Sequence, residues 1–296
     1  MSGTFDILMP YFGDVALMQD AVLSVLGQDG DDWHLTVVED CMTDPEPRRW
    51  CEQLASPRLT YVCNERNLGA NANFRKALAL ATADHVVVMG ADDLMLPGYL
   101  AAMREVLALH PGATVVQPGV TVVDGAGLPV RPVTDRVKTW AHRGAAGPTA
   151  WSGESLAASL LRANWTYFPS LCWRRETVQR IGFREGLHVV QDLALLLDVV
   201  LEGGTLVVDP RTTFRYRRHA ASDSSVRALS GDRFREEKAF FRAMAATCAA
   251  RGWSRAARAA EAHLTSRLHA AMLAPKALRT GDVSTGGRLL AHALGR

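Results

Sequence analysis

Short apolar segments alternate with segments of helical spacing through the first part of the chain. Runs such as FDILMP and HVVVMG are almost wholly apolar, which is typical of strands buried on both faces of a parallel sheet. Between them, apolar residues recur every three or four positions, as on one face of a helix. The alternation predicts an α/β fold, with a mainly parallel sheet flanked by helices. Strands are expected at 5–10, 34–40, 58–64, 85–90 and 113–127, the last followed by a turn, and helices at 15–26, 48–54, 71–81 and 99–109.

The rest of the chain is patterned differently. Residues 131–148 are rich in Gly, Ala, Pro and charge, and they are expected to form a loop. An Ala- and Arg-rich pattern over 232–274 predicts two helices that break at RGWS. We expect a main domain over 1–225 and a C-terminal helical extension over 226–296, which could cover a site, form a homodimer or rest on a membrane surface. Further helices are expected at 153–162 and 189–204, and strands at 204–209 and 212–219.

Composition narrows the function classes. The 296 residues are 48% hydrophobic and 22% charged, and the formal net charge is +2. A bias this small argues against nucleic acid as the main partner. The five cysteines are scattered without a CxxC pair, which is typical of reduced thiols. The sequence shows no signal peptide and no apolar run of the roughly 18 residues that a spanning helix needs. These features predict a cytoplasmic protein without a transmembrane segment.

Polar residues follow the predicted strands at the point where each strand ends. In open α/β sheets, ligands bind beyond the carboxyl ends of the strands, so these residues are expected to share one edge. Two adjacent carboxylates repel each other; Asp92 and Asp93 therefore form a solvated turn before Pro97 or hold a cation. The strand-end residues are Pro10 and Tyr11, Glu39 and Asp40, Asn64, and Asp92 and Asp93.

Five motifs in order resemble those of the family 2 glycosyltransferases, which have the GT-A fold. They are ILMPYFG, VVEDCMTD, the stretch from NERNLGANANF to GADDLMLPGYL, VVQDLALLLDVVLEGG and FRYRRHAASDSS. The resemblance covers about residues 5–225. It implies an enzyme that moves a sugar from a nucleotide-diphosphate sugar to an acceptor hydroxyl with inversion at the anomeric carbon. It also implies a divalent cation, Mn²⁺ or Mg²⁺, that bridges the diphosphate.

The resemblance assigns the cation to GADD, where the family usually has Asp-x-Asp-Asp. Asp92 matches the metal-binding aspartate, and Gly90 replaces an aspartate that often contacts the ribose. A cation held there would stabilise the charge on the leaving diphosphate. His219 is expected as a second metal ligand, Arg218 as a phosphate contact, and Asp93 as a contact to phosphate or acceptor.

The donor nucleotide is assigned to the first three strand ends. Asp40 matches the family aspartate that accepts a hydrogen bond from the base, which favours an imide N–H, so UDP is the expected donor nucleotide and dTDP the second. Pro10 and Tyr11 match the segment that packs on the base. Asn67 and Asn73 match the polar positions around the glycine of NLGANAN, where a helix start favours anions.

The general base is assigned to Asp192 in the QD pair, where Gln191 stands in place of the usual glutamate. Gln191 itself is expected to contact the acceptor or a phosphate. An alternative for Asp192 is a first-turn carboxylate that only balances the helix dipole. The aromatic residues around Trp173 line the acceptor pocket or pack in the core. Two other functions are weighed: a sugar-nucleotide nucleotidyltransferase, which would need a Gly-rich basic loop after the first strand, and a non-catalytic nucleotide-sugar binding module.

Overall fold

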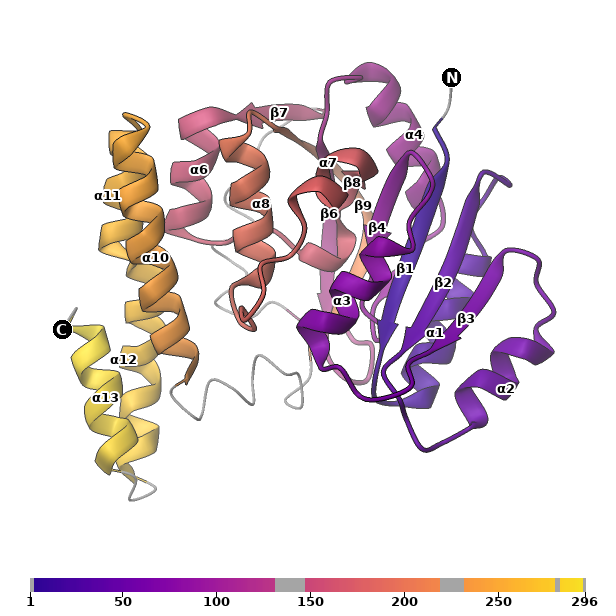
Figure 1. The fold of residues 1–296 in the computed structure, drawn as a ribbon, viewed down its shortest axis with the longest axis horizontal. Helices are drawn as coiled ribbons and strands as arrows, with labels where there is room; N and C mark the ends of the chain where they lie inside the picture. The colour runs from indigo at the N-terminus through magenta and orange to yellow at the C-terminus, as the bar shows by residue number, and fades with distance from the viewer. Residues whose placement is uncertain (1–2, 131–146, 219–231, 280–282, 295–296) are drawn as a thin grey trace.

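The computed structural model describes residues 3–130, 147–218, 232–279 and 283–294. A nine-stranded sheet occupies the centre of this described part (Figure 1). The strand β1 (Phe5–Tyr11) lies between β2 (Trp33–Glu39) and β4 (His85–Val88) and runs parallel to both. The strand β3 (Leu59–Cys63) extends the parallel set on the far side of β2. Their carboxyl ends therefore meet at one edge.

The second half of the sheet is mixed. The strand β8 (Cys172–Arg174) pairs antiparallel with β4 and with β6 (Val115–Val123). The strand β9 (Thr205–Arg217) runs parallel to β6 and antiparallel to β5 (Leu94–Met95) and β7 (Thr149–Ser152). Through its pairing with β5, the strand β9 places residues 214 and 215 beside the segment that follows β4.

One long strand, β9, replaces the two strands expected at 204–209 and 212–219. The strand stays continuous because its pairing with β6 is irregular at Gly119. A Cβ on Gly119 would lie 2.7 Å from the carbonyl oxygen of Pro210, so only glycine allows the two backbones to approach this closely. The short strands β5, β7 and β8 were also missed, because two to four residues carry no recognisable period.

Alternation along the parallel strands divides the core between the two faces of the sheet. Phe5, Ile7, Met9 and Tyr11 of β1 lie in one hydrophobic cluster, and Leu8 lies in the other. Helices α1 (Val15–Leu26), α2 (Glu46–Gln53) and α4 (Tyr99–Leu109) contribute buried residues to the first face. Helices α3 (Ala70–Ala79), α6 (Gly153–Arg162), α7 (Arg175–Ile181) and α8 (Gln191–Leu201) contribute to the second, with the 3₁₀ turn η1 (Phe168–Ser170) packed beside them.

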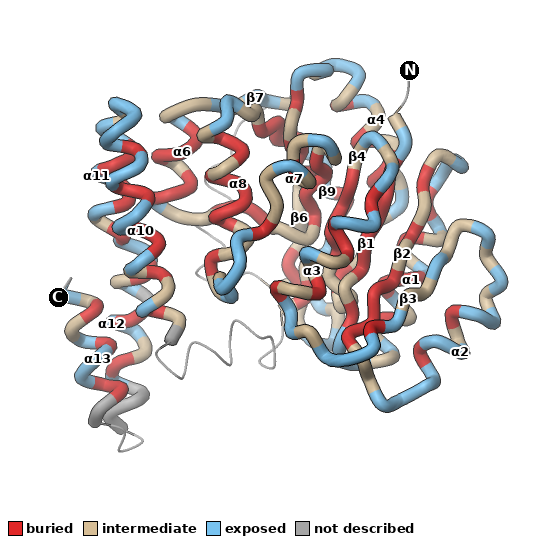
Figure 2. The backbone as a smooth tube through the Cα atoms, in the orientation of Figure 1, coloured by how far each residue is buried: buried red, intermediate tan, exposed pale blue. Residues whose placement is uncertain are grey.

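The C-terminal helices extend the second face. Helices α10 (Asp232–Ala250) and α11 (Ser254–Ala262) join the same hydrophobic cluster as α6 and α8 (Figure 2). Helices α12 (Leu264–Arg279) and α13 (Val283–Ala293) form a hairpin with a small cluster of its own. The predicted break at RGWS is confirmed. A second break falls at His263, whose φ of 42° is left-handed and ends α11.

No helix in the described ranges is long and apolar enough to cross a membrane. The expected loop at 131–148 lies almost wholly outside the described residues. A domain boundary at residue 225, a location in the cytoplasm and a homodimer through the C-terminal helices stay predictions.

Candidate functional site

The segment after β4 folds two carboxylates back over Gly90. A Cβ on Gly90 would lie 2.6 Å from Asp93 Oδ2 and 2.9 Å from Asp92 Oδ1. No side chain fits at that distance, so glycine allows both oxygens to approach the backbone. The two oxygens converge on one small space, and Mg²⁺ and Mn²⁺ prefer such oxygen ligands. The residues present therefore fit a divalent cation, although no group of three side-chain ligands occurs among the described residues.

Asp93 is the more deeply placed of the two. It is 1% exposed, whereas Asp92 is half-buried. Its Oδ1 accepts a hydrogen bond from the backbone N of Arg217 at 2.8 Å, and Arg217 Nε donates to the carbonyl oxygen of Asp92. Burial, and then the charge of Asp92, raises the pKa of Asp93 well above its usual range. Asp93 therefore joins β9 to the carboxylate turn through its Oδ1. Its expected contact to phosphate or acceptor stays a prediction.

Tyr216 of β9 lies near several charged side chains at the carboxyl edge of the sheet. Burial raises the pKa of its hydroxyl most, and the charges of Asp93, Asp92 and Asp192 raise it further, while that of Arg218 lowers it. The ring of Tyr216 packs against that of Tyr167, with centroids 5.4 Å apart. The end of β4, the start of α8 and the end of β9 are thus brought together. We call Asp92, Asp93, Asp192, Tyr216 and Arg218 the Tyr216 cluster.

Asp192 stands in the first turn of α8. Its Oδ2 accepts a hydrogen bond from Asn164 Nδ2 at 3.3 Å. Asn164 is itself fixed by Thr166, whose hydroxyl donates to Asn164 Oδ1 at 2.7 Å. The helix dipole favours the ionised carboxylate at this position. Asp192 is therefore a positioned carboxylate that can accept a proton.

The loop before α8 is held from two directions. Asn71 of α3 donates to Gln191 Oε1 at 2.8 Å and also to the carbonyl oxygen of Leu187. From α10, the carboxylate of Glu236 accepts the backbone N–H groups of residues 188, 189 and 190 at 2.7–3.0 Å. These N–H groups belong to the N-cap Val190 and to the two residues before it. Glu236 and Asn71 therefore fix the helix that carries Asp192, and neither was identified from the sequence.

At the end of β2, Asp40 is enclosed by its own chain. Its Oδ1 accepts hydrogen bonds from Asn64 Nδ2 and Leu68 N, and its Oδ2 accepts one from Gly69 N, all at 2.8 Å. Asn64 Nδ2 also donates to Asn73 Oδ1, and Asn73 Nδ2 donates to the carbonyl oxygen of residue 38. Asp40 and Asn73 are 2% and 3% exposed. We call Asp40, Asn64, Leu68, Gly69 and Asn73 the Asp40 network.

The Asp40 network gives two of the expected nucleotide contacts internal partners. Asp40 was expected to meet the base and Asn73 to contact the donor, but both side chains are buried and bonded to the protein. They hold the 64–69 loop against β2, and Gly69 can close the loop because its φ of 79° is open to glycine. Asn67 of the same loop is exposed, and its Oδ1 accepts Gly69 N at 3.0 Å. Of the two expected asparagines, Asn67 is exposed and Asn73 is buried.

A comparison with known families decides the identity of the main fold. The sequence model described as Glycosyl transferase family 2 matches residues 6–159, just over half of the chain. The chain belongs to glycosyl transferase family 2. The match includes the ends of β1, β2, β3 and β4, whereas Asp192 and Tyr216 lie beyond it.

Relatives agree with the family. WcaA of Escherichia coli (strain K12), which is named for a glycosyl transferase role in colanic acid biosynthesis, is 33% identical over 108 residues. That match covers 35% of this chain and 39% of WcaA, so the chain spans well under half of this relative's length. The uncharacterised protein MT1568 of Mycobacterium tuberculosis (strain CDC 1551 / Oshkosh) is 24% identical over 76% of this chain and 70% of its own length.

Solved structures confirm the expected fold. S. aureus TarS 1-349 in complex with UDP-GlcNAc superposes with a TM-score of 0.63 at 17% identity, over 80% of this chain and 65% of TarS. The complex of the same fragment with UDP gives a TM-score of 0.61 at 14% identity, over 99% and 92%. The α/β fold predicted from the motif order, a GT-A sheet flanked by helices with helices at the C-terminus, is therefore confirmed.

In this family 2 chain, the aromatic residue at the end of β1 is not the one expected. Tyr11 is 1% exposed, and its hydroxyl donates to the carbonyl oxygen of Gly13 at 3.1 Å. Phe12, the next residue, is 66% exposed beyond the same strand end, and Pro10 is half-buried. Strand alternation could have found this, because Tyr11 shares a face with the buried residues 5, 7 and 9. Phe12, and not Tyr11, therefore presents an exposed ring at this strand end.

For the aromatic residues around Trp173, the structure favours core packing over an acceptor pocket. Trp173 is 1% exposed on β8, between β4 and β6, and its ring packs 6.1 Å from that of Phe168. Trp165 and Tyr167 are likewise buried. These rings form core and do not line an acceptor surface. The reason is β8 itself, a three-residue strand that the sequence pattern does not show.

Three further expected residues can be placed. Arg218 is half-buried at the end of β9, where its charge acts on Tyr216. Gln191 is half-buried, and its side-chain oxygen is bonded to Asn71. His219, the expected second metal ligand, lies outside the described residues.

Proposed function

We propose that this protein is an inverting glycosyltransferase that takes its sugar from a nucleotide-diphosphate donor, with UDP first and dTDP second. One observation carries the proposal: Asp92 and Asp93 turn two oxygens toward one space at Gly90, and Asp192 stands as a second, positioned carboxylate at the start of α8. Family membership supports transfer from a nucleotide-sugar. The fold of TarS, which was solved with UDP-GlcNAc and with UDP, supports the choice of UDP.

The donor would lie along the strand ends. Phe12 offers an exposed ring beyond β1, and base–aromatic stacking stabilises binding by roughly 1–3 kcal/mol. The Asp40 network shapes the loop that faces the nucleotide, with Asn67 exposed on it. Arg218 supplies positive charge near Asp92, where the diphosphate would lie.

Asp92 is the residue we assign to a divalent cation, Mn²⁺ or Mg²⁺, with Asp93 Oδ2 beside it at Gly90. When bound, the cation stabilises the negative charge on the leaving diphosphate as a Lewis acid. Asp192 is the residue we assign to the general base. The acceptor oxygen forms a bond to the anomeric carbon as the bond to the diphosphate breaks, and the acceptor proton passes to Asp192. A single displacement of this kind inverts the anomeric centre.

The experiment measures UDP affinity by calorimetry with and without Mn²⁺, for wild type, Asp92→Ala and Asp20→Ala. Asp20 is an exposed carboxylate on α1 and controls for the lost charge. We expect Mn²⁺ to tighten UDP binding in the wild type and in Asp20→Ala, and to have little effect in Asp92→Ala. Equal affinity for UDP in all three proteins with Mn²⁺ would refute the metal assignment.

The same proteins are then offered UDP-, dTDP- and CDP-sugars with acceptor mixtures, and the anomeric configuration of the product is read by NMR. Inverted product from a UDP-sugar is the expected result. Product of retained configuration would exclude the single displacement. If no nucleotide-sugar is transferred or hydrolysed, the result favours a non-catalytic binding module. A parallel assay offers a nucleoside triphosphate with a sugar phosphate, and release of diphosphate there would favour a nucleotidyltransferase.

A further inference from the structure

The outer face of α12 is apolar and carries no charge at the positions that the structure describes. Its exposed residues there are Leu264, Thr265, Leu268, Ala271, Met272 and Pro275. A helix on the surface of a globular protein usually turns charged side chains to solvent, so this pattern is inverted. Leu264, Leu268 and Met272 are 55%, 64% and 69% exposed. They follow one another at intervals of four residues and therefore form one stripe along the helix.

Exposed apolar side chains are concentrated on the α12–α13 hairpin. Ten large apolar side chains are exposed among the described residues, and five of them belong to the hairpin or to the residue that follows it. Besides the stripe on α12, these are Leu290 and Leu294, which are 44% and 66% exposed. The described positions of α10 and α11 include none. Single exposed leucines need no explanation, but such a concentration marks an interaction surface.

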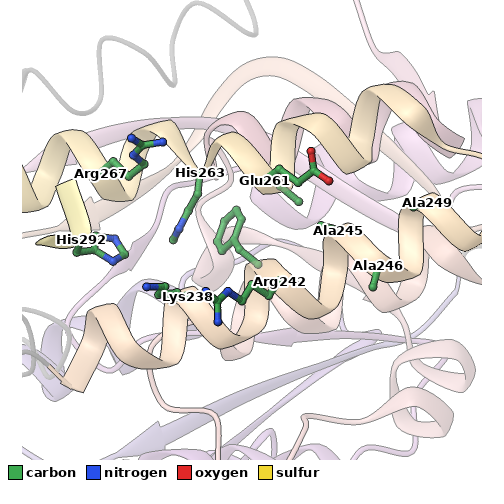
Figure 3. A pocket seen from close by; sticks show the side chains of 11 residues that line it. Lys238, Arg242, Ala245, Ala246, Ala249, Glu261, His263, Arg267 and His292 are labelled. Carbon is green, nitrogen blue, oxygen red and sulfur yellow. The ribbon is translucent and has the colours of Figure 1, made fainter. Parts of the chain in front are cut away.

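The stripe is not part of the core of the hairpin. Ala270 and Ala274 lie on the opposite side of α12, where they are buried in the small cluster shared with α10 and α13. The side of the hairpin that faces α10 is marked by His263 and His292, which line a pocket together with Lys238 (Figure 3). The stripe therefore points away from the helices that pack on α12.

The charge of this segment selects what covers the stripe. Residues 264–296 contain five of the 33 Lys and Arg of the chain and one of its 31 Asp and Glu, which gives a formal net charge of +4. The first 263 residues therefore carry −2. A second copy of the hairpin would bring another +4 to the contact, and like charges repel. A surface of anionic lipid matches both the positive charge and the apolar stripe.

Two of the five cations are placed by the structure. Arg288 of α13 is exposed, and its guanidinium donates to Thr285 Oγ1 at 3.1 Å. Arg267 of α12 is half-buried, and its Nε donates to the carbonyl oxygen of Ala293 at 3.0 Å. Both acceptors are uncharged, so these two hydrogen bonds orient the guanidinium groups without neutralising them.

We propose that the α12–α13 hairpin docks on a membrane surface that contains anionic lipid. Leu264, Leu268 and Met272 enter the boundary between headgroups and acyl chains, and the arginines of the hairpin lie near the headgroups. Apolar burial and electrostatic attraction then act together, because both belong to the same short segment. The inference rests on neither the donor nor the metal assignment.

The first experiment sediments the full chain with vesicles of phosphatidylcholine alone and of phosphatidylcholine and phosphatidylglycerol in equal parts. We expect binding to the mixed vesicles that is at least about tenfold tighter than binding to phosphatidylcholine. Binding should weaken as the salt concentration rises, because salt screens the attraction to the anionic headgroups. Failure to bind the mixed vesicles overturns the proposal.

A pair of leucine variants tests the stripe. Leu268→Gln removes its central side chain, and Leu109→Gln removes a leucine that is 70% exposed at the end of α4, outside the hairpin. Binding to the mixed vesicles should be about tenfold weaker in Leu268→Gln, which corresponds to about 1.4 kcal/mol, and unchanged in Leu109→Gln.

A pair of arginine variants tests the charge. Arg288→Gln removes an exposed cation of the hairpin, and Arg49→Gln removes an exposed cation of α2, at the opposite end of the molecule (Figure 1). Binding should be about fivefold weaker in Arg288→Gln, which corresponds to about 1 kcal/mol, and unchanged in Arg49→Gln. All four native side chains are exposed, so the melting temperature should not change in any variant.

Light scattering without lipid tests a second copy of the chain as the occupant. A protein whose mass is the same in wild type and in Leu268→Gln supports the membrane surface. A dimer that Leu268→Gln dissociates would overturn the proposal in favour of self-association. Vesicle binding that neither Leu268→Gln nor Arg288→Gln weakens would also overturn it, because the lipid would then be bound elsewhere.

Discussion

The Asp40 network and the Tyr216 cluster lie at strand ends on either side of β1, and both contain buried carboxylates. In the first, hydrogen bonds from the chain compensate the carboxylate, whereas in the second the carboxylates repel one another. Asp40 is 2% exposed and accepts three hydrogen bonds from its own chain. In the Tyr216 cluster, three carboxylates act on one hydroxyl, and Asp93 Oδ2 has no hydrogen-bond partner among the described residues. A carboxylate that is satisfied internally supports a loop, whereas carboxylates that repel one another are suited to a cation and a proton. Four predictions test this contrast.

The largest effect is expected for Asp192→Asn. Loss of the general base should lower turnover by at least the roughly 100-fold typical of such residues, while UDP and the cation still bind. Asp198→Asn is the matched control on the same helix, where the native carboxylate pairs with Arg184. Steady-state kinetics and UDP calorimetry measure both variants. Near-normal turnover in Asp192→Asn with its true acceptor would remove Asp192 from the mechanism.

Asp40→Ala should act on stability. Three donors would lose a buried acceptor, so we expect about 2 kcal/mol lower stability in urea unfolding. The preference for UDP over CDP should be unchanged, because the Asp40 carboxylate is enclosed by its own chain. A variant of normal stability that has lost the preference for UDP would show instead that Asp40 contacts the base.

Glu236→Gln tests the support of the Tyr216 cluster from α10. The amide keeps the size of the side chain but weakens three hydrogen bonds to the loop before α8, so turnover should fall by about tenfold with UDP affinity unchanged. Glu154→Gln is the control, since Glu154 accepts backbone N–H groups of residues 255 and 256 at the start of α11. Turnover that falls equally in both variants would indicate a general loss of stability.

The smallest effect is expected for Phe12→Ala. Loss of a stacking ring should weaken UDP by about 1 kcal/mol and leave the melting temperature unchanged, because the side chain is 66% exposed. Tyr11→Phe should keep UDP affinity, since the native hydroxyl bonds only to its own turn. If Tyr11→Phe weakens UDP and Phe12→Ala does not, the assignment of the two aromatic residues is reversed.

The alternation of apolar and helical segments predicted the α/β fold, and the motifs placed Asp92 at a strand end and Asp192 at a helix start, as in the structure. Errors arose where a residue's neighbours come from elsewhere in the chain. The sequence left Trp173 open between an acceptor pocket and the core, because β8 has only three residues and pairs with strands distant in sequence. Asn73 looked like a ligand contact because its partner, Asn64, belongs to another element.

Local pattern determined which residues form strands and helices, because alternation and helical spacing are properties of neighbouring residues. It also determined that carboxylates stand at strand ends. Tertiary structure alone decided which of those carboxylates are enclosed, because the donors that satisfy Asp40 come from the loop after β3, and the charges that converge on Tyr216 come from β4, α8 and β9. Hydrogen bonds and charge act through space, so the role of each carboxylate depends on contacts that sequence spacing does not encode.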